Sequence, residues 1–515
     1  MCDSKKKEFF ILLICFLIGF GLRFYTFDQK SLWMDEVYTY NDSRDGIREQ
    51  LAFYKENPTF LHPPLFFILT HLFHPFEKPE RDLRIIPLIF GTLSIPMIYI
   101  LAKQFSSTIA LPCTIALTLM TYHISLSQDG RSYSLLLFLG ITGLYFFLKY
   151  LKTLKKKYLP FIALIFAILF HTSYSSIPFI VLSQILWFYR PGEDPKKLSL
   201  SSFLILNGLI LLFCLPWLLF IAINYKGQMV MDPFHTESPG SLIYIFSGIF
   251  HDWVPFIPLT VVSLVLLILY PIFSKNKKNS FTLLAIFIIP ISGLYLFCKI
   301  LNISHFITSR YFISFLPLFF VTLFLSLDSI DTHLKRVRKY LRFKLLFLIL
   351  LISSNLVIFP LYYTSEKTDY RGLVKFLNSN LKDGDKIFVT ASGNMPPILH
   401  YFGTYPENRH YIMKTIKDSE KIIEVKYSFN YKGKPQIIIF SKTCCAQYVA
   451  DGSRLWIVAD KWTAKKLKEE APCVLKGYFD GSFLNFNKFP FDASMYLFLW
   501  DPSSPNEKGI DLQIE

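Results

Sequence analysis

Long apolar runs separated by short polar connections fill the first 365 residues of the chain. A helix needs about 20 predominantly apolar residues to cross the hydrocarbon core of a bilayer. Eleven runs reach or approach that length, at about 9–27, 84–103, 107–124, 132–150, 158–173, 174–189, 200–223, 254–273, 281–300, 311–327 and 344–363. The pattern predicts a polytopic α-helical membrane protein with about 11 transmembrane helices.

The stretch 158–189 decides whether the number of spans is odd or even. Two spans there would each be shorter than about 20 residues. However, the polar sequence from His171 to Ser176 divides the stretch and predicts a tight turn. Only with two crossings do the basic segments fall on one side of the membrane, as the positive-inside rule requires. These segments lie near 5–7, 103, 149–157, 190–197, 275–278 and 335–344.

The same topology fixes the expected location of both ends. Lys5, Lys6 and Lys7 precede an apolar stretch that begins at Phe9, and no small-residue cleavage site follows it. This predicts a retained first helix that starts in the cytoplasm. An odd number of spans then sends the C-terminus to the other side. We therefore expect a multi-pass protein of the cytoplasmic (inner) membrane with an extracytoplasmic C-terminal domain.

Residues 366–515 are expected to form a small soluble α/β domain, following a transmembrane catalytic domain of residues 1–365. Short runs rich in β-branched and aromatic residues predict strands at 386–390, 436–440, 455–459 and 496–500. Helical patterns at 371–381 and 461–470 alternate with them, which indicates an α/β unit. In an oxidising compartment, a disulfide from Cys473 to Cys444 or Cys445 and free thiols are equally expected.

Composition and charge agree with a membrane protein and exclude some partners. The 515 residues are 52% hydrophobic and only 18% charged, which excludes a soluble multidomain protein. The net charge of +16 would suit nucleic acid, but the basic residues collect in the predicted cytoplasmic segments. The long outer loop, 28–82, instead holds ten acids against six bases. We therefore expect the lipid bilayer, and no nucleic acid, as a partner.

Ionisable residues gather at the outer ends of the predicted spans. The set comprises Asp35, Glu36, His62, Asp129, Arg131, His235, Asp252, His305 and Arg310. An ion carrier would normally bury such groups near the middle of the bilayer. Their placement favours a site at the outer surface, reached by a substrate with a lipid tail and a polar head. His235, Glu237, His251 and Asp252 lack metal-site spacing on one helix face and are expected to be loop residues.

The residue types in this set suit a group-transfer reaction. A carboxylate beside an acceptor hydroxyl can act as a general base. Arginines provide fixed donors for a phosphate leaving group. Because Asp35 and Glu36 are adjacent, their side chains cannot point the same way from a helix or strand. One of them is expected to be the base, and the other a supporting or metal-binding group.

Five short motifs give the chain a resemblance to a known family. They are Ser31-Leu-Trp-Met-Asp-Glu36, His62-Pro-Pro-Leu65, Arg84-Ile-Ile-Pro-Leu-Ile-Phe-Gly91, Ser127-Gln-Asp-Gly-Arg-Ser-Tyr133 and Arg310-Tyr-Phe-Ile-Ser-Phe-Leu-Pro317. In this order and topology, the chain resembles the bacterial family 39-like glycosyltransferases of the C-type (GT-C) superfamily. That superfamily includes the protein O-mannosyltransferases and the aminoarabinose transferases of lipid A. The resemblance covers most of residues 9–363.

The resemblance implies an inverting transfer of one sugar from a polyprenyl-phosphate donor. The acceptor would be a glycolipid, a glycan or a protein hydroxyl. It also implies roles for individual residues: Asp35 as the base, with Glu36 and Asp129 as further catalytic acids. Phosphate-binding roles fall to His62, Arg131, Arg310 and Tyr311. No cofactor is certain; a divalent metal is one alternative, and Asp35 and Asp129 would be its ligands.

Other interpretations of the same residues stay open. A transporter or flippase of lipid-linked sugars is the main alternative, although no ionisable group lies near the middle of a predicted span. A receptor with a membrane anchor is another, but eleven spans exceed what an anchor needs. His62 could bond only to backbone at a helix start, and Trp33 could stack on a sugar ring. The amphipathic segment from Ile47 to Tyr54 could lie along the membrane surface.

Overall fold

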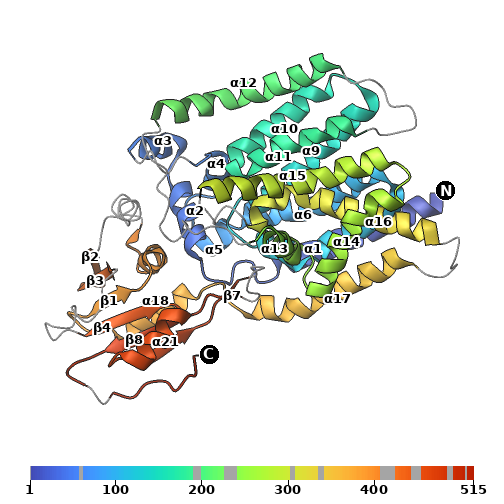
Figure 1. Cartoon of the computed structure of the whole chain (residues 1–515). Helices are drawn as coiled ribbons and strands as arrows, with labels where there is room; N and C mark the ends of the chain where they lie inside the picture. The colour runs from blue at the N-terminus through green and yellow to red at the C-terminus, as the bar shows by residue number, and fades with distance from the viewer. Residues whose placement is uncertain are drawn as a thin grey trace.

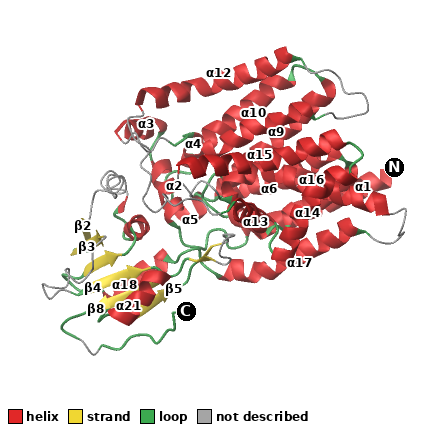
Figure 2. Ribbon diagram, in the orientation of Figure 1, coloured by secondary structure: helices red, strands yellow, loops and turns green. Residues whose placement is uncertain are grey.

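The computed structural model describes residues 2–56, 62–189, 199–224, 241–301, 308–334, 342–405, 424–441, 454–483, 491–504 and 507–514. Within these ranges, long helices pack side by side into one body, and a sheet domain lies at one end of it (Figures 1 and 2). The long helices are α1 (Cys2–Phe24), α6 (Ile85–Phe105), α7 (Ser107–Thr118), α9 (Tyr133–Thr153), α10 (Tyr158–Thr172), α12 (Leu200–Asn224), α13 (Leu242–Trp253), α14 (Ile257–Phe273), α15 (Lys277–Leu301), α16 (Leu316–Leu334) and α17 (Phe343–Thr364).

Each of the eleven predicted spans falls on helical structure, but not every one is a single long helix. In the described residues, six helices are long and apolar enough to cross a membrane, or up to eight if each bent pair is one span. One bent pair joins α7 to α8 (Thr121–Ser127) at an angle of 60°. The stretch 158–189 holds α10 and then the short segments η1 (Tyr174–Ser176), α11 (Ile177–Leu182) and η2 (Ser183–Phe188). The predicted turn falls between α10 and η1, where Ser173 caps η1 by accepting a bond from the Ser175 amide.

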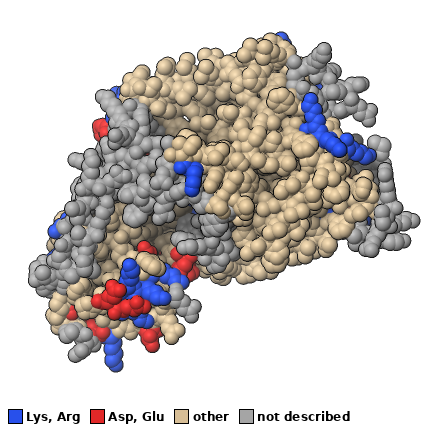
Figure 3. Space-filling model, viewed as in Figure 1, with Lys and Arg blue, Asp and Glu red and all other residues tan. Residues whose placement is uncertain are grey.

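The body of helices has the charge distribution of a membrane domain. The face shown in Figure 3 is largely without charged residues across its middle. Lys103 pairs with Glu8 at 3.0 Å, and Lys344 pairs with Asp328, at the end of the body where the chain begins. Helix α6 runs from Arg84 at its N-cap to this end, and its 21 residues span about 30 Å. That length matches the hydrocarbon core of a bilayer.

Four short helices follow α1 in the predicted outer loop: α2 (Met34–Arg44), α3 (Ile47–Glu56), α4 (Leu65–His71) and α5 (Pro79–Asp82). The amphipathic segment predicted from Ile47 to Tyr54 forms α3. Its Phe53 and Tyr54 are buried in the core of the helical body, where the Tyr54 ring lies 6.2 Å from that of Trp217. The apolar face of α3 therefore packs against protein, not against lipid.

The C-terminal domain is built on a six-stranded mixed sheet with the order β2-β3-β1-β4-β8-β5 (Figure 2). Central β1 is parallel to β3 and β4, and the outer pairings are antiparallel. The strands are β1 (Lys386–Val389), β2 (Glu424–Tyr431), β3 (Lys434–Ser441), β4 (Leu455–Ala459), β5 (Val474–Phe479) and β8 (Met495–Trp500); β6 (Ser482–Phe483) and β7 (Phe491–Asp492) form a separate ribbon. The helices are α18 (Tyr370–Asn380), α19 (Met395–Tyr401) and α21 (Lys461–Glu470).

The predicted strands β1, β3, β4 and β8 and the predicted helices α18 and α21 are confirmed. Strands β2 and β5 were not predicted. In β5 the buried and less buried positions mostly alternate, and Gly477 and Lys476 interrupt the apolar run that a sequence pattern would need. The predicted disulfide partners Cys444 and Cys445 lie outside the described residues.

The outer loop and the C-terminal domain share one apolar core. Leu32, Val37 and Leu83 are fully buried in the same cluster as Leu373 of α18 and Ile387 of β1. The first loop and the described part of the C-terminal domain therefore lie on the same side of the helical body. This arrangement requires an even number of crossings between them, as the ten later predicted spans do.

Candidate active site

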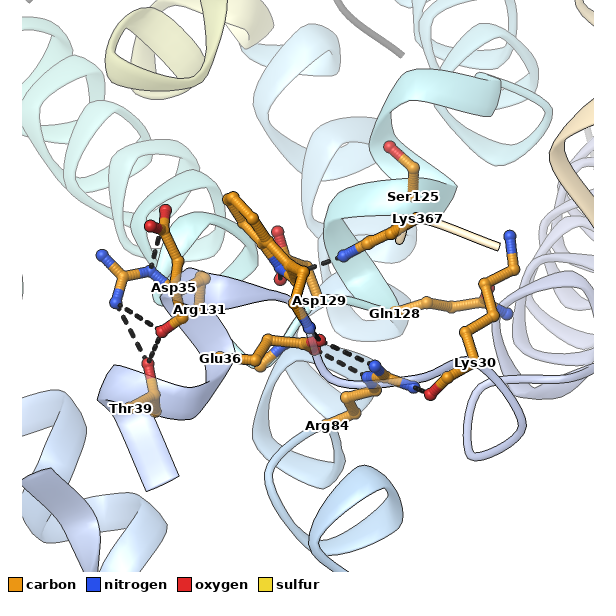
Figure 4. A network of polar contacts seen from close by, with 12 residues as sticks. Lys30, Asp35, Glu36, Thr39, Arg84, Ser125, Gln128, Asp129, Arg131 and Lys367 are labelled. Atoms are coloured by element: carbon orange, nitrogen blue, oxygen red, sulfur yellow. Dashed lines mark hydrogen bonds and ion pairs between the residues drawn. The ribbon is translucent and has the colours of Figure 1, made fainter. Parts of the chain in front are cut away.

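The acidic motif begins a helix at the junction of the body and the C-terminal domain. Trp33 is the N-cap of α2, and Asp35 and Glu36 lie in its first turn, where acidic groups favourably meet the positive end of the helix dipole. Successive residues of a helix point in directions about 100° apart. The two carboxylates therefore enter different surroundings, as their adjacency predicts (Figure 4).

Glu36 is completely buried and held by a two-pronged ion pair. Arg84 donates from Nε to Oε1 and from Nη2 to Oε2, both at 2.7 Å. The amide of Gly130 donates to Oε1 at 2.7 Å. Burial alone would raise the pKa of Glu36, but Arg84 and Lys367 outweigh it and hold the pKa at about 2. With no exposed surface and its oxygens engaged, Glu36 ties the start of α2 to α6 and to the loop after α8.

Arg84 completes this buried junction. Besides Glu36, its guanidinium donates to the carbonyl oxygens of Phe27 and Lys30 at 2.9 Å and of Ser31 at 3.1 Å. It thereby orients the backbone that leads into the acidic motif. Arg84 stood in a quoted motif without an assigned role. The sequence did hold a sign of its role: an arginine at the first position of an apolar span is costly unless an acid pairs with it.

Asp35 alone among the three acids keeps a partly exposed carboxylate. Its Oδ2 lies 3.4 Å from Arg310 Nη1 and 4.0 Å from Arg131 Nε. Arg131 also donates to the Asp35 carbonyl at 3.2 Å and to Thr39 Oγ1 at 3.1 Å, which fixes the guanidinium against α2 (Figure 4). Two cationic side chains, Arg131 from the loop before α9 and Arg310 from a 3-10 helix, therefore converge on one accessible carboxylate.

Arg310 sits among aromatic rings. It belongs to η4 (Ser309–Phe315), and its guanidinium carbon lies 5.6 to 5.8 Å from the ring centres of Trp33, Tyr133 and Tyr311. Such faces attract a cation without neutralising it. Arg310 therefore keeps hydrogen-bonding capacity for an anion. Tyr311, which was also predicted to bind phosphate, contributes one of these three rings.

Asp129 is buried between a tryptophan and a lysine. Trp33 Nε1 donates to its Oδ1 at 2.9 Å, and Lys367 Nζ lies 3.1 Å from the same oxygen. Burial raises the pKa of Asp129, and Lys367 opposes that rise. Trp33 is itself buried, so its ring faces Asp129, Arg310 and Lys367. Because the Trp33 ring is buried, this structure does not present it for the suggested stacking on a sugar.

The remaining predicted residues have different surroundings or lie outside the described part of the chain. His62 precedes α4 and packs edge-on against Phe67 at 6.4 Å. Burial lowers the pKa of its imidazole, and the charges of Asp42, Arg131 and Asp35 also act on it, so His62 lies within electrostatic reach of Asp35. His235, Glu237 and His305 lie outside the described residues. The prediction that His251 and Asp252 are loop residues is wrong, because both lie in α13. Asp252 is buried and accepts a hydrogen bond from Ser309, next to Arg310, so its carboxylate supports the start of η4.

Lys367 and Lys30 were not predicted as site residues. Lys367 lies between α17 and α18, and Lys30 follows α1; both are buried, with Lys30 Nζ bonded to the Tyr362 carbonyl and 3.8 Å from its ring centre. Burial, aided by Lys367, lowers the pKa of Lys30 to about 7. A lysine after a membrane span normally signals topology, so the sequence offered no sign that the fold would bury them.

The acids do not form a metal site in the described part of the chain. No group of three or more His, Cys, Asp or Glu side chains that could hold a metal ion occurs there. Asp35, Glu36 and Asp129 are each paired with a basic side chain. The predicted alternative of a divalent ion on Asp35 and Asp129 therefore does not fit these surroundings.

Comparisons with known proteins agree with this architecture. Residues 61–220 match the family described as dolichyl-phosphate-mannose-protein mannosyltransferase. The fold is similar to ArnT from Cupriavidus metallidurans in the apo state (TM-score 0.53) and bound to undecaprenyl phosphate (0.50), each at 10% identity over 96% of this chain and 98% of that chain. An Archaeoglobus fulgidus oligosaccharyltransferase tethered with an acceptor peptide is 12% identical over 90% of this chain and 70% of that chain (TM-score 0.49). A search of curated proteins found no match.

The family match over residues 61–220 and the similarity of fold agree with a polytopic membrane glycosyltransferase of the GT-C type. The resemblance predicted from the five motifs is confirmed. The roles of the individual residues stay predictions.

Proposed function

We propose that the protein transfers one sugar from a polyprenyl-phosphate donor to a hydroxyl acceptor at the outer face of the cytoplasmic membrane, with inversion at the anomeric carbon. The observation that carries this proposal is the partly exposed carboxylate of Asp35 between Arg310 and Arg131. A base and two phosphate-binding cations are the groups that such a transfer needs. The undecaprenyl phosphate bound to the similarly folded ArnT supports the donor class.

The transfer is a single displacement. The acceptor oxygen attacks the anomeric carbon and forms the new C–O bond as its proton passes to Asp35. The bond between the anomeric carbon and the phosphate oxygen breaks on the opposite face, and the electron pair leaves with the lipid phosphate. Arg310 and Arg131 receive the phosphate charge that develops, and the arginines loosen their hold on Asp35 as they do so. Glu36 and Asp129 stay buried and keep α2 and Trp33 in position.

The position of the site suits a lipid-linked donor. Arg84 stands at the start of α6, about 30 Å of helix away from Lys103 at the basic end. The reacting groups thus lie at one boundary of the apolar body, where a sugar-phosphate head group can enter while its polyprenyl chain stays in lipid. By the positive-inside rule, the basic end is the cytoplasmic one.

The test is sugar release from a panel of radiolabelled polyprenyl-phosphate sugars by the purified protein in bilayers, with glycolipid, glycan and peptide acceptors supplied. We expect one donor to be consumed and Asp35→Asn to lower turnover by ~10²–10⁴-fold, the usual contribution of a general base. Asp28→Asn, an exposed carboxylate of the same loop, is the matched control and should keep turnover. Full turnover in Asp35→Asn would contradict the assignment. Intact donors throughout would point to translocation of lipid-linked sugars.

A further inference from the structure

Lys367 reaches the site from the segment that joins the two domains. It lies two residues before the N-cap of α18, and its Nζ lies 3.1 Å from Asp129 Oδ1, with both side chains less than a tenth exposed. Its ammonium also lies 5.5 Å from the centre of the Trp33 ring (Figure 4 shows Lys367 and Asp129). A cation from the C-terminal part of the chain is therefore built into the acidic centre of the membrane domain.

Among the described residues, each of the three acids of this site is already paired with a base. Three acids, Asp35, Glu36 and Asp129, face four bases, Arg84, Arg131, Arg310 and Lys367. A divalent ion beside Asp129 would stand next to the Lys367 ammonium, and the repulsion would be strong in a poorly solvated site. The surplus of positive charge instead suits an anion such as the lipid phosphate.

We propose that the Lys367 ammonium is the fixed counter-cation of Asp129 and takes the place that a divalent metal would have among the acids of this site. The inference deepens the proposed function and rests on it for the effect on turnover. Lys367 is a positioning residue: by compensating Asp129, it keeps Trp33 Nε1 bonded to that carboxylate and the Trp33 ring against Arg310. Removing only one partner of a buried pair leaves an uncompensated charge.

The backbone on either side of Lys367 is also held in place by hydrogen bonds to the first loop. Glu366 accepts a hydrogen bond from the Ser31 amide at 2.8 Å, and the amide of Arg371 donates to Ser31 Oγ at 3.2 Å. The connection on both sides of Lys367 is therefore bonded to the residue that begins the acidic motif. The C-terminal domain thus delivers a charge to the site as part of its own anchoring.

The experiment combines metal binding with charge substitution. Mn²⁺ is titrated into the full-length protein in bilayers and followed by electron paramagnetic resonance, for wild type and Asp129→Asn. We expect no bound Mn²⁺ that depends on Asp129, and we expect wild-type turnover to persist in excess chelator. A Mn²⁺ site lost in Asp129→Asn would overturn the proposal, whatever the turnover assay shows, so its failure is separate from failure of the proposed function.

The second arm compares Lys367→Met with Lys367→Arg. We expect Lys367→Met to lower kcat at least about tenfold with less change in the donor KM, and Lys367→Arg, which keeps the charge, to restore most of it. The double variant Lys367→Met with Asp129→Asn should melt at a higher temperature than Lys367→Met, because no buried charge is left unpaired. Full turnover in Lys367→Met, or no recovery of melting temperature in the double variant, would contradict the proposal.

Discussion

The hydroxyl of Tyr401 accepts a hydrogen bond from the backbone amide of Leu32 at 2.7 Å, although the two residues are 369 positions apart in the chain. The same hydroxyl donates to Glu80 at 3.0 Å and accepts from Ser31 Oγ at 3.1 Å. One side chain of α19 therefore holds the backbone three residues before Asp35 and links it to α5. The C-terminal domain positions the acidic motif directly.

Tyr401→Phe removes this hydroxyl and keeps the ring. We expect the free energy of unfolding to fall by about 1–3 kcal/mol, because the largely buried Leu32 amide loses its acceptor. Turnover should fall with it, since the start of α2 is less firmly held. Thermal melting and sugar transfer measure both effects. An unchanged melting temperature would show that the hydroxyl is dispensable for holding the loop.

Glu36→Gln tests the buried pair with Arg84. We expect a loss of about 3–5 kcal/mol at neutral pH, because the Arg84 charge stays buried without its partner. The pKa of Glu36 is held at about 2, below its ordinary value of 4.5, so the wild-type advantage is present above pH 4.5 and is lost as the pH falls towards 2. Melting of both proteins across this range measures the advantage. A constant difference down to pH 2 would contradict the pairing.

Lys30→Met tests the buried lysine at the end of α1. The folded-state pKa is about 7, against 10.5 ordinarily, so between these values the unfolded chain binds a proton that the folded protein does not. Wild-type stability relative to Lys30→Met should therefore rise as the pH increases from 7 to about 10. Melting temperatures of the two proteins give the measurement. No change in their difference over this interval would show that Lys30 stays charged in the fold.

Arg310→Gln removes one of the two cations that converge on Asp35. We expect turnover to fall by ~10²–10³-fold, the usual cost of losing one group that stabilises a developing anion. Arg310→Lys should recover only part of this loss, because lysine lacks the planar guanidinium that can hold phosphate and contact rings together. Lys103→Gln is the control and should transfer sugar as wild type does, because Lys103 lies at the end of α6 far from the site. Equal rates in Arg310→Gln and the control would remove Arg310 from the reaction.

The sequence predicted the helices and the proximity of Asp35 to Arg131 and Arg310, and the reasons for the misses are physical. Apolar length located the spans, but it could not show that Thr118 and Thr121 flank a bend or that residues 174–188 form short segments. The motifs predicted that Asp35, Arg131 and Arg310 share one site, and the structure places both arginines beside the Asp35 carboxylate. Lys367 could not be predicted, because its contact with Asp129 depends on how two domains pack and on no local pattern.

Glu36 is closer in sequence to the residues that support it, at 48 positions from Arg84 and 94 from Gly130. Arg84 and Gly130 both lie in the quoted motifs, but the motifs did not show that these residues bind Glu36. Its adjacency to Asp35 indicated only that the two acids differ in role. Burial decided which one supports and which one stays accessible.

The bonds from Ser31 to Glu366 and from Leu32 to Tyr401 also set an order of events during biosynthesis. The acidic motif emerges from the ribosome 335 and 369 residues before these two partners. The loop cannot take its final form until the last helix and the following domain have been synthesised. A partly synthesised chain therefore lacks the contacts that hold the acidic motif, and the site is complete only when the C-terminal domain has folded against it.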